Sequence, residues 1–203
     1  MAKSVTSEII KADHVRLAFV QLDKPTKIGK NEEEIPKYRL TVLFDPSNAA
    51  HAEMIKKVNS EGKRIALEFW EGTIPKSLER CFGNGNDLDK VYNGFADMFY
   101  VRVSTPDLPP IIGRQKNPST KTFMQVNPGE KGFPYSGCYA NVSLTLWTQD
   151  SHGRKGLNGN LRVVQFVEDG ESFKGAAPAN ADQEFEELPA AGDAGAGGAD
   201  NWG

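Results

Sequence analysis

The charge of the chain changes abruptly at about Gly175, and this change limits what can fold. Residues 175–203 carry six acidic residues and no basic residue, and they are rich in glycine and alanine. A segment of this kind buries too little apolar surface to fold by itself. The rest of the chain has 24 basic and 21 acidic residues, so the net charge of -3 conceals a positive body. The sequence predicts one globular domain over residues 1–174 and a flexible acidic tail over residues 175–203.

Several classes of protein do not fit the composition. No apolar run approaches the length needed to cross a bilayer, and residues 1–20 lack the apolar core of a secretory signal, so we expect a cytoplasmic protein. The two cysteines, Cys81 and Cys138, are far apart in apolar surroundings and are expected to be reduced thiols. The three histidines are scattered and lack the spacing of a zinc site. We therefore expect no disulfide, no metal and no cofactor.

About five segments have the pattern expected of β-strands. These segments are residues 14–20, 38–44, 99–104, 139–147 and 161–167. In the first segment, Val15, Leu17 and Phe19 are expected to face the core. One long amphipathic helix is predicted over residues 48–71. This count of elements favours a mainly β fold, namely a five-stranded OB-fold barrel with one long α-helix and extended loops, followed by a disordered acidic tail.

Basic and aromatic residues gather along and between these strands. Residues 100–166 carry eight basic and three acidic residues, and residues 21–36 form an exposed loop that contains three lysines. Single-stranded nucleic acid requires a positive groove that follows its phosphates and aromatic faces on which unpaired bases stack. The candidate DNA-binding residues are Lys24, Lys27, Lys30, Tyr100, Arg102, Arg114, Lys116, Lys121, Tyr135, Tyr139, Trp147, Arg154 and Lys155.

The aromatic candidates also have a plainer explanation. Tyr100, Tyr139 and Trp147 fall on the polar faces of their strands. An aromatic side chain in such a place either stacks on a base or packs beneath the helix or beneath the long basic segment 105–134. A single lysine is usually a solvated surface group, so the lysines count only as a cluster. The sequence leaves open which aromatic residues stack on bases.

Five blocks of the sequence resemble a family of tailed-bacteriophage single-stranded DNA-binding proteins. They are residues 38–46, 92–102, 133–147, 156–160 and 164–171, and the resemblance covers most of residues 14–174. The blocks are distinctive in combination rather than singly. This family is similar in plan to the single-stranded DNA-binding protein of phage T7. The resemblance implies an OB-fold body and an acidic C-terminal tail that contacts replication and recombination proteins.

The resemblance also implies a function. It predicts a non-enzymatic protein that coats and protects single-stranded DNA, with little sequence preference, during phage DNA replication, recombination or repair in the cytoplasm of an infected bacterial host. A homodimer is compatible with this function. The candidate partner-binding residues of the tail are Asp193, Asp200 and Trp202. Tails of this family typically end in a dense acidic cluster, whereas here the acids are spread among glycine and alanine, so a plain solubilising extension is the alternative.

Two other functions stay open at this point. An OB-fold protein that binds RNA or duplex DNA would present the same kinds of residues. A metal-dependent nuclease would need acidic ligands for Mg²⁺, for which Asp87, Asp89 and Asp97 are candidates. Asp87 and Asp89 lie in a glycine- and asparagine-rich segment that lacks the signatures of a phosphate loop and of a calcium loop, so this segment is expected to be a turn.

Overall fold

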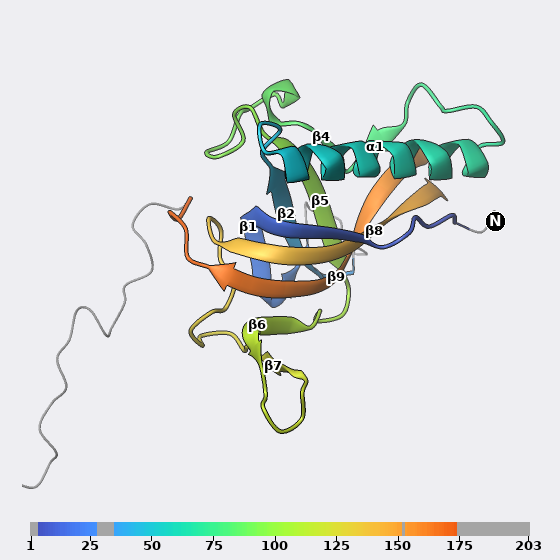
Figure 1. Ribbon diagram of the computed structural model, residues 1–203. Helices are drawn as coiled ribbons and strands as arrows, with labels where there is room; N and C mark the ends of the chain where they lie inside the picture. The colour runs from blue at the N-terminus through green and yellow to red at the C-terminus, as the bar shows by residue number, and fades with distance from the viewer. Residues whose placement is uncertain (1–3, 28–34, 152, 174–203) are drawn as a thin grey trace, which may run out of the picture.

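Five strands form a closed ring at the centre of the computed structural model (Figure 1), which describes residues 4–27, 35–151 and 153–173. The strands are β1 (Ile10–Thr26), β2 (Lys37–Phe44), β5 (Phe99–Thr105), β8 (Tyr139–Ser151) and β9 (Arg154–Glu168). Antiparallel pairing joins β5 to β2, β2 to β1, β1 to β8 and β8 to β9. A parallel contact between Ser104 of β5 and Asn160 of β9 closes the ring. The predicted five-stranded OB-fold barrel is thereby confirmed.

Closure of the barrel depends on a glycine in β9. A Cβ atom on Gly159 would lie 2.4 Å from the backbone oxygen of Arg102 and 2.8 Å from Cγ1 of Val103. Real Cβ atoms do not approach a backbone oxygen so closely. Residue 159 must therefore lack a side chain for β9 to cross β5 at this distance.

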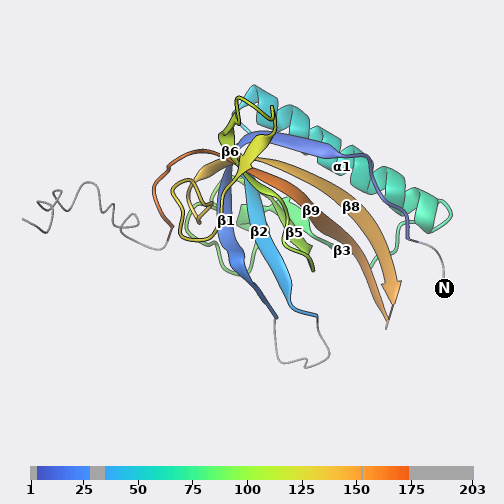
Figure 2. The ribbon, with the colours of Figure 1, turned by 90° about the horizontal axis from the view of Figure 1, so that it is seen from below.

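The predicted helix is present and lies along one side of the barrel, against β1 and β8 (Figures 1 and 2). It is α1 (Ala49–Phe69), and the side chain of Asn48 caps its N-terminus by accepting hydrogen bonds from the backbone N–H groups of Ala50 and His51. Its buried face includes Val58 and Ile65, which pack into the core of the barrel. The observed helix is slightly shorter than the predicted range 48–71, because the cap residues Asn48 and Trp70 are not helical and Glu71 has a positive φ of 48°.

Short elements fill the connections between the barrel strands. They are β3 (Glu79–Arg80), β4 (Phe82–Asn84), the 3-10 helix η1 (Gly85–Asp87), β6 (Ile111–Lys116) and β7 (Phe123–Gln125). Strand β3 pairs with β9, and β4 pairs with β5. Strands β6 and β7 form a hairpin that begins beside β9 and extends away from the barrel (Figure 1). The long basic segment 105–134, in which no strand was predicted, therefore contains this hairpin. No helix of the described residues has the length and apolar character needed to span a membrane.

The predicted inward faces of the strands are largely confirmed. The apolar residues from Cys138 to Leu146 are buried at every second position, as the alternation predicted. Within the described residues, Cys81 and Cys138 are both free thiols. The predicted strand segments were too short at their ends, since β1 continues through Thr26 and β9 begins at Arg154.

The prediction for Phe19 was wrong. Its φ is 48°, and the register between β1 and β2 shifts between Ala18 and Gln21. Such a β-bulge inserts an extra residue and reverses the alternation beyond it. The side chain of Phe19 therefore lies on the surface, with 49% of its area exposed.

Candidate nucleic-acid interface

A groove of about 1270 Å³ runs across the face of β2 and β5 that points away from the core. Its floor is set by the strand register, in which Arg39 pairs with Ser104 and Thr41 pairs with Arg102. Side chains at alternate positions share one face of a sheet, so these four residues form a continuous polar surface. OB-folds bind oligonucleotides on this face, between the loop that joins the first two barrel strands and the loop that joins the last two.

The groove is strongly positive. Six basic residues line it, whereas Glu79 is the one acidic residue among the described lining residues. The basic residues are Lys27, Lys37, Arg39, Arg80, Arg102 and Arg154. Arg154 Nη2 lies 2.6 Å from Oε2 of Glu79, and both side chains are well exposed, so this ion pair contributes little stability and its arginine is available to an incoming phosphate. The Arg39 guanidinium donates a hydrogen bond to the carbonyl oxygen of Thr26 and is thereby held against the end of β1.

Two accessible aromatic side chains line the groove, namely Phe19 and Trp147. The Phe19 ring meets the Tyr92 ring edge-on, with centroids 5.0 Å apart, and lies 5.5 Å from the Phe95 ring. These contacts hold Phe19 in place while half of its surface stays open to solvent. Trp147 is half-buried on β8. Each of the two rings can stack on an unpaired base.

A neutral thiol also lines the groove. Cys81 lies between β3 and β4, and burial raises its pKa to about 12. For the same reason the pKa of Cys138 in the core rises to about 11. Both groups therefore remain protonated at neutral pH. Cys81 adds no negative charge to a surface that would meet phosphates.

Tyr100 does not offer a face to a base. It is 8% exposed and belongs to a cluster with Ala18, Leu43 and Phe95, which we call the outer cluster. The segment that carries Phe95 covers the Tyr100 ring, and the Arg102 guanidinium lies 4.8 Å from its centroid. The predicted role of Tyr100 in base stacking therefore does not fit its position, because a buried ring supports its arginine neighbour instead.

Tyr135 and Tyr139 lie outside the groove lining. The Tyr135 hydroxyl accepts a hydrogen bond from the Gly170 backbone N–H at 3.0 Å, and burial raises its pKa. The Tyr139 ring stacks on His14, with centroids 4.9 Å apart, and His14 Nε2 lies 2.8 Å from a carboxylate oxygen of Glu168. Both tyrosines hold the end of β9 and the segment after it against β1 and β8.

The other predicted residues divide into four groups. Lys27, Arg102, Trp147 and Arg154 are brought together in the groove. Arg114, Lys116 and Lys121 lie on the β6–β7 hairpin, where the Lys116 ammonium is 4.9 Å from the centroid of the Phe123 ring. Lys24 is exposed near the end of β1, and Lys155 lies 4.0 Å from Asp150, outside the groove lining. Lys30, Asp193, Asp200 and Trp202 lie outside the described residues.

Sequence reasoning missed Phe19, Lys37, Arg39 and Arg80. Arg39 falls on the polar face of its strand, so the alternation rule that selected Arg102 would also have selected it. Phe19 gives no such signal, because its apolar neighbours at every second position place it in the core unless the bulge is known.

The described residues contain no group of three His, Cys, Asp or Glu side chains that could hold a metal ion. Among the acidic residues considered for Mg²⁺, the Asp97 carboxylate accepts a hydrogen bond from the Asn86 side-chain amide, and the Asn86 side chain accepts one from the Asp97 N–H. This reciprocal pair joins η1 to the segment before β5. The Asp97 carboxylate is therefore engaged in a structural hydrogen bond between these two segments.

Comparison with known proteins shows the same likeness in sequence and in fold. Residues 7–195 match the family model described as Enterobacter phage Enc34, ssDNA-binding protein. A relative from Acyrthosiphon pisum secondary endosymbiont phage 1, putative protein p50, is 32% identical over 186 residues, which cover 88% of this chain and 93% of the relative.

Solved structures agree with this likeness. The single-stranded DNA-binding protein from bacteriophage Enc34 in complex with ssDNA superposes with a TM-score of 0.66 at 22% identity, over 81% of this chain and 89% of that chain. Another structure of the Enc34 protein superposes with a TM-score of 0.63 at 20% identity, over 87% of this chain and 90% of that chain. At these identities the superpositions establish a shared fold.

Proposed function

The chain belongs to the family of the Enterobacter phage Enc34 single-stranded DNA-binding protein, and we propose that it binds single-stranded DNA by laying the strand in the groove across β2 and β5. The family agrees with the resemblance noted in the sequence, and it is a family of binding proteins rather than enzymes. The single observation that carries the proposed location is the groove itself. It combines six basic residues with two accessible aromatic rings on the face that OB-folds use for oligonucleotides.

Binding in the groove combines two physical contributions. The lysines and arginines neutralise phosphates and release the counterions that were condensed on the strand, so affinity falls as the salt concentration rises. Phe19 and Trp147 stack on unpaired bases, which every base permits because every base has a π-face. Neither contribution depends strongly on sequence. The protein therefore coats the strand without reading it, as replication, recombination or repair of a phage genome requires.

The acidic tail competes with DNA for the same groove in this proposal. The chain enters the tail after Phe173, whose ring packs against the outer cluster and lies 4.3 Å from the Arg16 guanidinium. Phe95 of the outer cluster also contacts Phe19 at the groove, so Phe173, the last described residue, lies near one end of the binding surface. Once DNA displaces it, the tail is available to replication or recombination proteins, with Asp193, Asp200 and Trp202 as the candidate contacts.

Reversal of one groove charge tests the proposed location. Arg102→Glu removes a cation from the groove floor and adds a carboxylate, so it should weaken binding of a fluorescent oligo-dT by about tenfold or more at low salt. Lys63→Glu makes the same charge change at an exposed position on α1 and should alter affinity less than about twofold. Fluorescence anisotropy measures both affinities, and competition with RNA and duplex DNA distinguishes the other nucleic acids. Equal effects of the two variants would place the strand elsewhere.

A further inference from the structure

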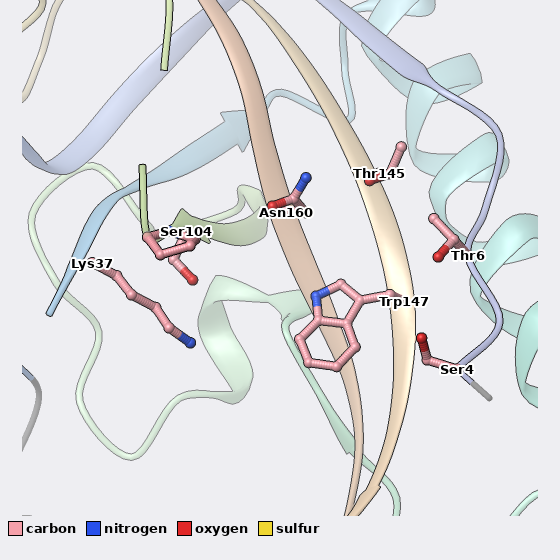
Figure 3. Close-up of a pocket in the computed structure, with 8 residues that line it drawn as sticks. Ser4, Thr6, Lys37, Ser104, Thr145, Trp147 and Asn160 are labelled. Carbon is pink, nitrogen blue, oxygen red and sulfur yellow. The ribbon is translucent and has the colours of Figure 1, made fainter. Parts of the chain in front are cut away.

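A second, smaller pocket lies beside the groove. Its volume is about 240 Å³, and its lining comes from four strands, from Pro106 directly after β5 and from the segment that precedes β1. The lining residues are Ser4, Thr6, Lys37, Ser104, Pro106, Thr145, Trp147 and Asn160. Figure 3 shows the Trp147 indole in the middle of this set, with Ser4 and Thr6 on one side and Lys37 and Ser104 on the other.

Hydrogen bonds hold the segment before β1 in place, so this wall of the pocket has a defined position. Thr6 forms a β-bridge with Trp147. The Val5 backbone N–H donates to the Thr148 hydroxyl at 2.8 Å, and the Thr148 backbone N–H donates to the Val5 carbonyl at 3.0 Å. Thr148 is fully buried. These bonds fix Ser4 and Thr6 along the edge of β8, beside the indole.

The pocket continues the groove. Lys37, Ser104 and Trp147 line both the groove and the pocket. A strand that follows the groove past Lys37 therefore arrives at the indole, with the pocket directly behind it. A base that leaves the groove here can enter the pocket while its phosphate stays beside the Lys37 ammonium.

The chemistry of the lining suits a polar, uncharged group with a flat face. The pocket has one cation and no carboxylate among its lining residues, and four of its side chains are hydroxyl groups. Within the described ranges, the side-chain polar atoms of Ser104, Thr145 and Asn160 make no hydrogen bond to another protein group. Thr145 lines the pocket and is only 5% exposed, which makes it the most deeply buried of the four hydroxyl side chains.

We propose that this pocket holds one unpaired nucleobase of the bound strand, stacked on Trp147 with its polar edge toward Thr145 and Asn160. The inference rests on the proposed function and adds a subsite to it. A hydroxyl group can donate or accept, and an amide side chain offers both a donor and an acceptor. A lining of this kind pairs with the edge of any base. The pocket therefore adds affinity without adding sequence preference.

The test separates contacts to bases from contacts to the backbone. Anisotropy measures the affinity of the full chain for oligo-dT and for an abasic oligomer of the same length, which keeps every phosphate and lacks every base. Thr145→Val keeps the shape of the side chain and removes its hydroxyl. It should weaken binding of oligo-dT about three- to tenfold and leave binding of the abasic oligomer unchanged.

A matched control makes the same chemical change outside both the groove and the pocket. Thr105→Val alters the half-buried residue that follows Ser104 in β5, which lines neither of them. It should leave the ratio of the two affinities at the wild-type value. Ser104→Ala, at a half-buried position, is the second pocket variant if Thr145→Val fails to fold, as judged by circular dichroism.

The outcomes are distinguishable. Loss of affinity for oligo-dT alone supports the pocket. An unchanged ratio in both pocket variants, or an equal loss for both oligomers, overturns the subsite and leaves the proposed function standing. If the wild-type chain binds neither oligomer at low salt, the proposed function itself fails, and the subsite fails with it.

Discussion

At the scale of single residues, the interface depends on whether an aromatic ring has a free face. Phe19 has one, because its bulge turns it out of the barrel, whereas Tyr100 is covered by Phe95. Phe19→Ala should weaken binding of oligo-dT by about 1–3 kcal/mol, the range for one stacked base. Tyr100→Phe keeps the ring that supports Arg102 and should bind as the wild type does. Fluorescence titration of both variants checks this, and a larger loss in Tyr100→Phe than in Phe19→Ala would reverse the assignment.

These two residues also show what sequence can predict at this scale. Alternation correctly placed Tyr100 and Arg102 on the non-core face of β5. It could not reveal that the segment directly before β5 would fold over Tyr100 and leave Arg102 exposed. The burial of Tyr100 depends on Phe95, whose position is set by the turn that Asn86 and Asp97 close, and this is tertiary information. The bulge at Phe19 could likewise not be predicted, because the alternation of apolar residues continues through it.

At the scale of elements, the groove exists because β9 crosses β5 and closes the barrel at Gly159. Gly159→Ala should lower the free energy of unfolding by about 1–3 kcal/mol, because the new methyl group meets a backbone oxygen that cannot move aside. Gly156→Ala is the matched control in the same strand, since its Cβ would meet only the Asn158 side chain at 3.5 Å or more. Urea unfolding followed by circular dichroism compares them. Indistinguishable midpoints would mean that closure tolerates a side chain at residue 159.

The elements themselves were largely predictable, and their connections were less so. The alternation of apolar residues and the amphipathic pattern of α1 located the barrel strands and the helix, because the core imposes both patterns directly. The sequence predicted the region of the β6–β7 hairpin only as a long basic segment without strands. Its exposed residues, such as Arg114 and Phe123, pack against no core that could impose a pattern. Because no burial pattern was available for this hairpin, its basic residues were predicted to bind DNA from their charge alone.

At the scale of the whole molecule, the charge break near Gly175 is the basis of the proposed competition between the tail and DNA for the groove. A chain that ends at Lys174 loses six acidic residues and should bind oligo-dT more tightly than the full chain at low salt. The difference should vanish at high salt, because screening weakens the attraction between tail and groove. Replacing the six acids with their amides, at full length, should reproduce the effect of truncation. If neither the truncated chain nor the amide variant binds more tightly than the full chain, the tail is a plain solubilising extension.

The path of the strand is the central claim, and photocrosslinking tests it most directly. An oligo-dT that contains 5-iodo-deoxyuridine is bound to the full chain and irradiated, and mass spectrometry of the digested complex identifies the aromatic residues that are attached. Crosslinks at Phe19 and Trp147 are the predicted result, because these two rings line the groove. Crosslinks concentrated at Tyr139 or Phe123, which lie on other surfaces, would contradict the account and move the interface away from β2 and β5.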